Sequence, residues 1–241
     1  MTYCVAMRLK EGLVFVSDSR TNAGVDHIAV FRKLHVFGVE GESIFVLQSA
    51  GNLATSQSVV TLLRQRIEHQ TEGHLHSVKT MYDAAELVGA TLREVLKKYK
   101  EQDVDFSCSL LLGGQILGQE PKLYNIYPQG NFIAATQDTP YFQIGESKYG
   151  KPILDRALHY DTPLEQALRC ALISFDSTIR SNLSVGTPLD LLVYLNHSFH
   201  IPKGRRLFDD DPYFNTIRSQ WSEGLQQVLA QLPSPPEDYW Q

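Results

Sequence analysis

Apolar residues in the first fifty positions recur in short, almost continuous runs instead of at helical spacing. Such runs are typical of strands, and a run without polar alternation indicates a strand buried on both of its faces. Turn residues between the runs, Gly12 and Glu40-Gly41-Glu42, predict two hairpins in succession. The predicted strands cover residues 2–9, 13–17, 33–39 and 43–49.

Helical periodicity follows, with apolar side chains recurring every three to four positions. It predicts helices over residues 54–70, 81–99, 148–159, 162–180 and 212–232. Further short apolar runs predict strands over 106–112, 116–117, 122–127, 131–135, 141–144 and 189–195. We expect Gly113-Gly114 and Pro128-Gln129-Gly130 to separate neighbouring strands, because glycine and proline mark turns.

The predicted elements come in blocks: four strands, two helices, several strands, two helices, a strand and a last helix. No linker rich in Gly, Ser or Pro divides the chain, which predicts a single domain over 1–241, with 201–241 as a C-terminal extension. Two blocks of strands, each followed by a helix pair, favour two sheets packed together with helices outside. The expected fold is therefore a four-layer αββα sandwich of the α/β (α+β) class.

Composition narrows the function only a little. The chain has 241 residues and a net charge of −5, an ordinary globular balance without electrostatic attraction for nucleic acid or an anionic membrane. No apolar run approaches the roughly 20 residues that span a bilayer. The three cysteines are far apart, without a CxxC pair, which favours a reducing compartment. We expect a cytoplasmic protein with neither nucleic acid nor membrane as a partner.

The most informative candidate for catalysis is Thr2. Its small side chain permits an aminopeptidase to remove Met1, which would leave a hydroxyl and a free α-amine on one residue. The α-amine has an ordinary pKa of about 7.7–8.0, so it can accept the hydroxyl proton near neutral pH. This is the threonine–amine form of an activated nucleophile.

Three further residues fit chemistry around Thr2. Asp18 ends the second predicted strand, so the first hairpin brings it close to Thr2. Lys33 begins the next strand, and a cation there would lower the pKa of the threonine hydroxyl. Gly51, where a strand gives way to a helix, offers a backbone N–H suited to an oxyanion.

Taken together, these motifs resemble the N-terminal third of proteasome β-subunits, which are N-terminal nucleophile hydrolases. The motifs are the N-terminal threonine, SDSRTNAG at 17–24, a following lysine in FRK, and SAGNLA at 49–54. They cover roughly residues 2–55, and a weaker similarity to the same subunits extends over residues 144–194. The sequence is similar over most of its length to one bacterial family, the ancestral β-subunit or Anbu.

The resemblance implies a proteasome-like fold and a threonine hydrolase of peptides or small amides. It implies that Thr2 is the nucleophile, that Asp18 and Lys33 complete its charge network, and that Gly51 N–H forms the oxyanion hole. Ser147 and Ser184 resemble the serines that support the threonine amine. The residues that would line the substrate groove are Arg20, Thr21, Asn22, Ser49 and Ala50.

One departure keeps an alternative open. Proteasome subunits usually carry an aspartate three residues before the second supporting serine, where this chain has Ser181, and Asp176 is out of register. The alternative is a self-assembling scaffold or binding protein with weak or absent catalysis. Both hypotheses imply self-association as a ring or open spiral. The sequence leaves open whether an unfoldase or adaptor serves the particle.

We expect no cofactor and no metal. The histidine pairs, His74 with His76 and His197 with His200, lack a matching cluster of cysteines or carboxylates at ligand spacing. The acidic run Asp209–Asp211 precedes a proline and is typical of a solvated turn.

Overall fold

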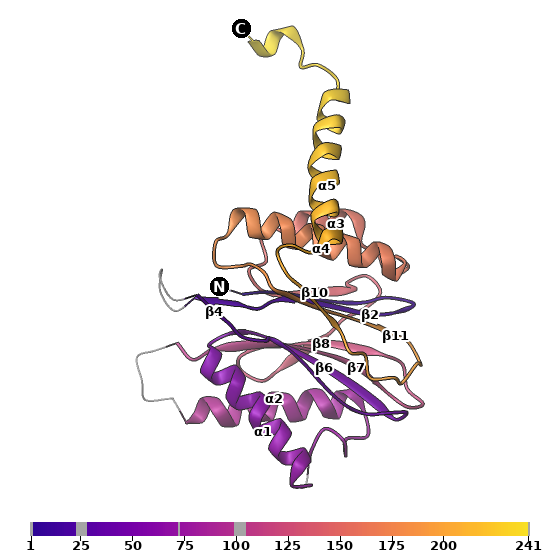
Figure 1. Cartoon of the computed structure of the whole chain (residues 1–241). Helices are drawn as coiled ribbons and strands as arrows, with labels where there is room; N and C mark the ends of the chain where they lie inside the picture. Colours follow the sequence, from indigo (N-terminus) through magenta and orange to yellow (C-terminus); the bar gives the residue numbers. More distant parts are fainter. Residues whose placement is uncertain (1, 23–27, 72, 99–104, 241) are drawn as a thin grey trace.

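Two antiparallel sheets lie face to face between two pairs of helices, as predicted (Figure 1). The structure is a computed structural model that describes residues 2–22, 28–71, 73–98 and 105–240. The loop expected around Gly24 and the predicted helix end at Tyr99 lie outside these residues. The αββα sandwich expected from the sequence is therefore the observed architecture.

The first sheet has the strand order β10-β1-β2-β11-β12, so it joins the two ends of the chain. Its strands are β1 (Tyr3–Arg8), β2 (Gly12–Asp18), β10 (Tyr141–Gly145), β11 (Leu189–Leu195) and β12 (Arg205–Leu207). The second sheet follows chain order, β5-β6-β7-β8-β9. Its strands are β5 (Leu34–Val39), β6 (Ser43–Gly51), β7 (Cys108–Ile116), β8 (Lys122–Ile126) and β9 (Phe132–Ala134).

The helices cover the outer faces of the sheets. The second sheet is covered by α1 (Leu53–Glu68) and α2 (Met81–Lys97), and the first by α3 (Lys151–Ala157) and α4 (Leu164–Ser181). Local capping defines two of the helix starts, because the side chains of Asn52 and Thr80 accept hydrogen bonds from the backbone of the first turns of α1 and α2. No helix in the described part of the chain combines the length and apolar character needed to cross a membrane.

Strand β2 illustrates why a continuous apolar run indicates a strand that is buried on both faces. All seven of its residues are buried. Because side chains alternate along a strand, Val14 and Val16 pack against the outer helices, whereas Leu13 and Phe15 pack between the two sheets. The fold therefore has three apolar slabs, one on each outer face and one in the middle.

The expectation that Gly113-Gly114 separates two strands is wrong. Both glycines lie inside β7, opposite Val46 and Phe45 of β6. A Cβ on Gly113 would come within 2.6 Å of the Phe15 ring, and one on Gly114 within 2.0 Å of the Ile44 carbonyl oxygen. These glycines are required by close packing, and they do not make a turn.

Two other differences concern short elements. The helix expected from residue 148 begins at Lys151, with Gly150 as its N-cap, so Ser147 lies before the helix. The pattern also missed the small hairpin of β3 (Arg20–Asn22) and β4 (Ile28–Val30), as well as β12. Strands of three residues are too short to show periodicity in the sequence.

The last long helix, α5 (Pro212–Gln231), begins on the domain and projects away from it, ending before the short helix η1 (Glu237–Trp240) (Figure 1). Phe214 and Ile217 anchor its first turns in the outer core of the first sheet. Asp211 caps the helix by accepting a hydrogen bond from Phe214 N at 3.0 Å. The rest of α5 exposes apolar residues such as Leu229 to solvent.

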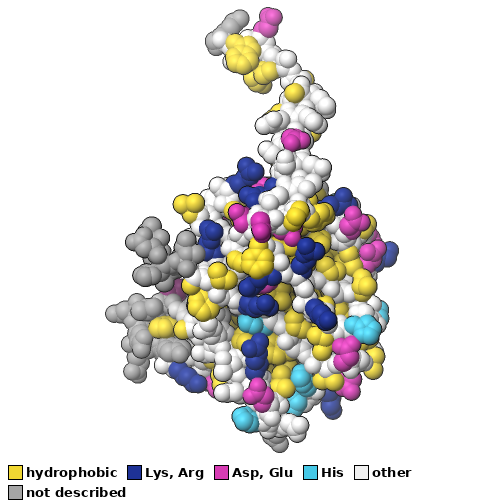
Figure 2. Space-filling view, viewed as in Figure 1, with side chains coloured by type: hydrophobic (Ala, Val, Ile, Leu, Met, Phe, Trp, Pro, Cys, Tyr) yellow, Lys and Arg dark blue, Asp and Glu magenta, His cyan; other side chains and the backbone are white. Residues whose placement is uncertain are grey.

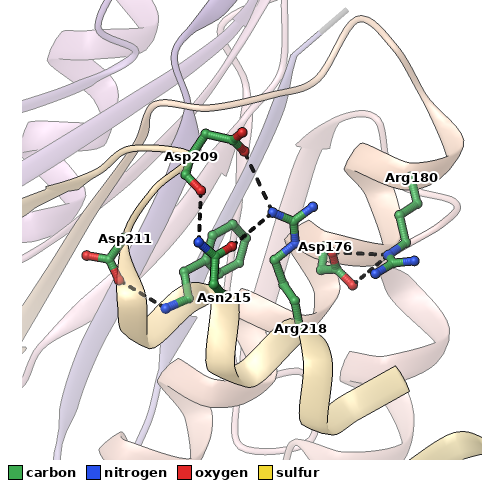
Figure 3. A network of polar contacts seen from close by, with 7 residues as sticks. Asp176, Arg180, Asp209, Asp211, Asn215 and Arg218 are labelled. Atoms are coloured by element: carbon green, nitrogen blue, oxygen red, sulfur yellow. Dashed lines mark hydrogen bonds and ion pairs between the residues drawn. The ribbon is translucent and has the colours of Figure 1, made fainter. Parts of the chain in front are cut away.

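An ionic network also fixes the root of α5 (Figure 3). The buried carboxylate of Asp176, on α4, accepts hydrogen bonds from Arg180 Nε and from Arg218 Nε of α5, the latter at 2.8 Å. Arg218 also pairs with Asp209 at 3.6 Å. Asp176 is therefore engaged between α4 and α5.

Candidate active site

Thr2 lies at the start of β1, directly beside the end of β10. Its carbonyl oxygen accepts a hydrogen bond from Glu146 N at 2.7 Å. Gly145 makes this approach feasible, since it has a φ of +81° and a Cβ there would lie 2.0 Å from the Thr2 carbonyl oxygen. Thr2, which is half-buried and directly precedes the strand, is thus held in place through its backbone.

The first hairpin brings Asp18 to the same end of the sheet. Cys4 pairs with Ser17 across β1 and β2, which places the end of β2 beside the start of β1. Asp18 Oδ1 accepts hydrogen bonds from Tyr3 N at 3.0 Å and from Lys33 Nζ at 2.8 Å. The structure thus places Asp18 and Lys33 beside Tyr3, the residue that follows Thr2.

Lys33 is almost completely buried, with 4% of its surface exposed, and Asp18 is fully buried. The Lys33 ammonium also donates to the Arg20 carbonyl oxygen at 2.6 Å. Burial raises the pKa of the Asp18 carboxyl to about 6, against the opposing effects of Lys33 and of the Tyr3 N–H. The carboxylate is therefore ionised at pH 7 and protonates on mild acidification.

A small cavity joins these groups. It has a volume of about 30 Å³, roughly the space of one water molecule. Its lining residues are Thr2, Thr21, Lys33, Ser49, Ala50, Gly51, Leu53 and Ser56. Thr2, the Lys33 cation and the Gly51 backbone therefore meet around one small space.

Gly51 ends β6 in a conformation that requires glycine. Its φ is +120°, and a Cβ would come within 2.5 Å of the Ser107 carbonyl oxygen. The next residue, Asn52, caps α1, so the positive end of that helix lies close to the cavity. A developing negative charge beside Gly51 would meet a favourable potential there.

The proposed groove residues lie on two segments that flank the cavity. Ser49 and Ala50 are buried in β6, and Ser49 N donates to the Lys33 carbonyl oxygen at 3.0 Å. On β3, Arg20 donates through Nη1 to the Leu183 carbonyl oxygen at 3.2 Å, which links this strand to the loop that carries Ser184. Thr21 Oγ1 is buried without a hydrogen-bond partner among the described residues. The third predicted groove residue, Asn22, pairs with Ile28 in β4.

The two predicted supporting serines are placed differently. Ser147 is exposed and lines a neighbouring cavity with residues such as Gln143 and Lys151. Ser184 is half-buried, and its N–H donates to Asn182 Oδ1 at 3.0 Å. Neither serine lines the small cavity beside Thr2.

Two polar residues beside this site, Glu146 and Asn182, were not among the residues predicted from the sequence. Glu146, which is 6% exposed, accepts a hydrogen bond from Asn182 Nδ2 at 3.0 Å and another from Lys148 N at 2.9 Å. Asn182 directly follows the exposed Ser181, where an aspartate was expected. The only sequence feature that could have indicated Glu146 is its position directly after Gly145, at the end of a predicted strand.

The other candidate residues take structural positions. His197 Nδ1 pairs with Gln115 Nε2 at 2.8 Å, and His200 Nδ1 pairs with Glu40. Within the described residues, no three His, Cys, Asp or Glu side chains come together as metal ligands. The three cysteines are buried free thiols, and burial raises their pKa values above the usual thiol range.

Comparison with known proteins gives consistent matches. A family model described as proteasome subunit matches residues 2–193. The helical assembly of the Anbu complex from Pseudomonas aeruginosa is 63% identical, with 98% of this chain and 99% of that chain covered and a TM-score of 0.94. Anbu from Yersinia bercovieri is 60% identical, with the same coverage and a TM-score of 0.94. Anbu from a Hyphomicrobium species is 47% identical, covers 97% and 99% of the two chains, and has a TM-score of 0.91. No curated protein matches significantly.

Proposed function

Because this chain belongs to the proteasome subunit family, and within it to the Anbu group, we propose that it is an N-terminal threonine hydrolase of peptides or small amides. The observation that carries the proposal is the buried Lys33–Asp18 pair, whose lysine lines the same small cavity as Thr2. A buried ion pair beside a cavity is a costly arrangement that active sites use and that ordinary cores avoid.

The reaction requires removal of Met1. The freed α-amine of Thr2 takes the hydroxyl proton, and Thr2 Oγ1 attacks the substrate carbonyl carbon. The tetrahedral intermediate collapses to an ester on Thr2 while the amine delivers the proton to the departing nitrogen. Water, deprotonated by the same amine, then attacks the ester, releases the acid product and restores the hydroxyl.

Lys33 and Asp18 serve this chemistry through charge. The Lys33 ammonium favours the ionised form of the Thr2 hydroxyl and so lowers its pKa. Asp18 and the Arg20 carbonyl oxygen hold the ammonium from two sides, at 2.8 and 2.6 Å. Because the pair is buried, its attraction for the developing oxyanion is screened little by solvent.

Gly51 N–H is the proposed oxyanion donor, supported by the start of α1. The backbones of Arg20–Asn22 and Ser49–Gly51 would pair with an extended peptide on the two sides of the cavity. Only the reacting group needs to enter the cavity of about 30 Å³, and the rest of the substrate lies outside it.

Glu146 and Asn182 are proposed as positioning residues for Thr2. Glu146 holds the Thr2 carbonyl through its backbone N–H and is itself fixed by Asn182. Asn182 also accepts from Ser184 N, so it connects the predicted supporting serine to the same arrangement. Ser147 and Ser184 remain proposed supporting residues.

The test is intact mass and N-terminal peptide mapping of the untagged protein, with and without a peptide epoxyketone. This reagent forms its ring adduct only with a hydroxyl and a free amine on one residue. We expect loss of Met1 and one adduct on Thr2. Thr2→Ala abolishes both adduct and hydrolysis, whereas Thr61→Ala, at an exposed position on α1, leaves both unchanged. Full hydrolysis by Thr2→Ala would refute the proposal.

A second candidate function is a self-assembling scaffold without catalysis, which the exposed Ser181 and the narrow cavity favour. Retention of Met1, with no adduct, would support it. For either function we propose self-association, supported by the helical assembly described for the Pseudomonas aeruginosa relative. A monomer at micromolar concentration in light scattering would contradict this. We place the protein in the cytoplasm, supported by its three free thiols.

A further inference from the structure

A second cavity, of about 330 Å³, opens where the edges of the two sheets meet. It shares no lining residue with the cavity beside Thr2, although Arg32 and Leu34 of its wall flank Lys33 in sequence. Its lining contains five cationic side chains: Arg32, Arg64, Lys203, Arg205 and Arg206. The charge is concentrated locally, because the chain as a whole is acidic.

The five cations reach the cavity from segments that are distant in the sequence. Arg32 precedes β5, Arg64 projects from α1, and Lys203, Arg205 and Arg206 lie at or beside β12. Figure 2 shows Lys and Arg side chains gathered across the middle of the globular part on the side viewed. The tertiary structure therefore assembles a basic wall that no single stretch of sequence encodes.

Only part of this charge is neutralised. Arg206 donates two hydrogen bonds to the buried Asp190 carboxylate, at 2.8 and 2.7 Å, and Arg205 pairs with Asp211 at 3.1 Å. Among the described residues, Arg32, Arg64 and Lys203 form no ion pair. Arg64 instead lies over the Phe37 ring, 5.9 Å from its centroid. Three uncompensated cations thus surround one concave space.

The pKa of His35 is affected by the positive charges around this cavity. Burial lowers its pKa to about 4, and the charges of Arg64 and Arg32 act in the same direction, against the opposing influence of Asp190. The imidazole is therefore neutral at pH 7 and can donate or accept a hydrogen bond inside the cavity. A bound anion would stabilise the imidazolium and raise this pKa.

We propose that this cavity binds a small, multiply charged phosphate anion of the oligophosphate class. Its volume is at the lower end of small-molecule sites, which excludes a nucleic acid duplex and admits a chain of two or three phosphates. Guanidinium groups match phosphate oxygens with paired N–H donors, and Arg206 is already fixed in orientation by Asp190. A single carboxylate would leave most of the positive charge uncompensated.

The test is isothermal titration calorimetry of the assembled protein with inorganic tripolyphosphate, in low-salt buffer without divalent metal. Arg32→Gln/Arg64→Gln is compared with Lys97→Gln/Lys122→Gln, which removes the same charge from exposed positions of α2 and β8. We expect one site per wild-type chain, about tenfold weaker binding in the arginine variant and an unchanged constant in the control.

Two further titrations define the ligand. Citrate should bind at least tenfold more weakly than tripolyphosphate, and equal binding would overturn the phosphate assignment. Adenosine triphosphate distinguishes a free oligophosphate from a nucleotide, and loss of its binding in the arginine variant supports the site in either form. The His35 pKa, followed by NMR, should rise on binding. Absence of wild-type binding at millimolar tripolyphosphate, or equal loss in both double variants, would overturn the proposal.

Discussion

Gly145→Ala tests whether the backbone contact beside Thr2 is functional. Gly145 has a φ of +81°, and an alanine Cβ would lie 2.0 Å from the Thr2 carbonyl oxygen and 2.8 Å from its carbon. Such an overlap with backbone forces β1 and β10 apart at this point. Gly41→Ala is a matched control, because Gly41 has the same φ of +81° and nothing within 4 Å of its Cβ position.

The two variants share the backbone cost and differ in the displacement. A left-handed alanine costs about 1 kcal/mol of folding free energy in each. Gly145→Ala also weakens the 2.7 Å hydrogen bond from Glu146 N to the Thr2 carbonyl oxygen, which adds about 1 kcal/mol. A shift of Thr2 by about 1 Å would lower kcat/KM about 10²-fold, because the hydroxyl leaves its attack geometry.

Hydrolysis of a fluorogenic peptide gives kcat/KM, and urea unfolding gives the free energy of unfolding for the same preparations. We expect Gly41→Ala to lose stability alone, and Gly145→Ala to lose both stability and nearly all activity while remaining folded. Equal activities of the two alanine variants would refute the claim that this contact positions the nucleophile.

Three other predictions address charge and packing. The first concerns pH: Asp18 has a pKa of about 6, and the Thr2 amine is expected to have a pKa of about 7.8. Because both groups must lose a proton, log(kcat/KM) should rise with pH with a slope of about 2 below pH 6 and about 1 between pH 6 and pH 7.8. A slope of 1 that continues down to pH 5 would contradict this prediction. Asp18→Asn should lower kcat/KM about 10²-fold in the same peptide assay, since Lys33 loses its anchor, whereas Asp161→Asn, which breaks an exposed pair with Lys10, should have no effect. Phe214→Ala should lower the free energy of unfolding in urea by about 3–5 kcal/mol, because Phe214 is fully buried at the start of α5. Leu229→Ala, on the exposed part of α5, should lower it by less than about 0.5 kcal/mol. Equal losses of stability would contradict the packing of α5 described above.

The layers of the fold could be predicted because the spacing of apolar residues indicates which faces of each strand and helix are buried. Strand β2 is buried on both faces, and its four central residues, Leu13–Val16, are all apolar. The long helices likewise show their periodicity over four or more turns. The same reasoning failed at Gly113 and Gly114. Glycine is used both in turns and where a strand closely approaches another group, here Phe15 or Ile44, and the sequence does not distinguish the two uses.

The site residues divide along a similar line. The approach of Asp18 to the start of β1 follows from an antiparallel hairpin, which is a local structure. Glu146 and Asn182 meet only because β10 pairs with β1 and the loop after α4 returns to the same edge, across 36 positions of sequence. Asp176 shows the converse, since it resembled a displaced site carboxylate and instead holds Arg180 and Arg218 between two helices.

By itself, therefore, the sequence determined the order of the long helices and the two N-terminal hairpins, the doubly buried strands and the approach of Asp18 to Thr2, since each depends on neighbours within a few tens of residues. The tertiary structure alone decided which sheet edges meet, which polar residues surround Thr2 and where five cations gather around His35. Those arrangements depend on contacts between distant segments, and the pattern along a single chain carries no record of such distances.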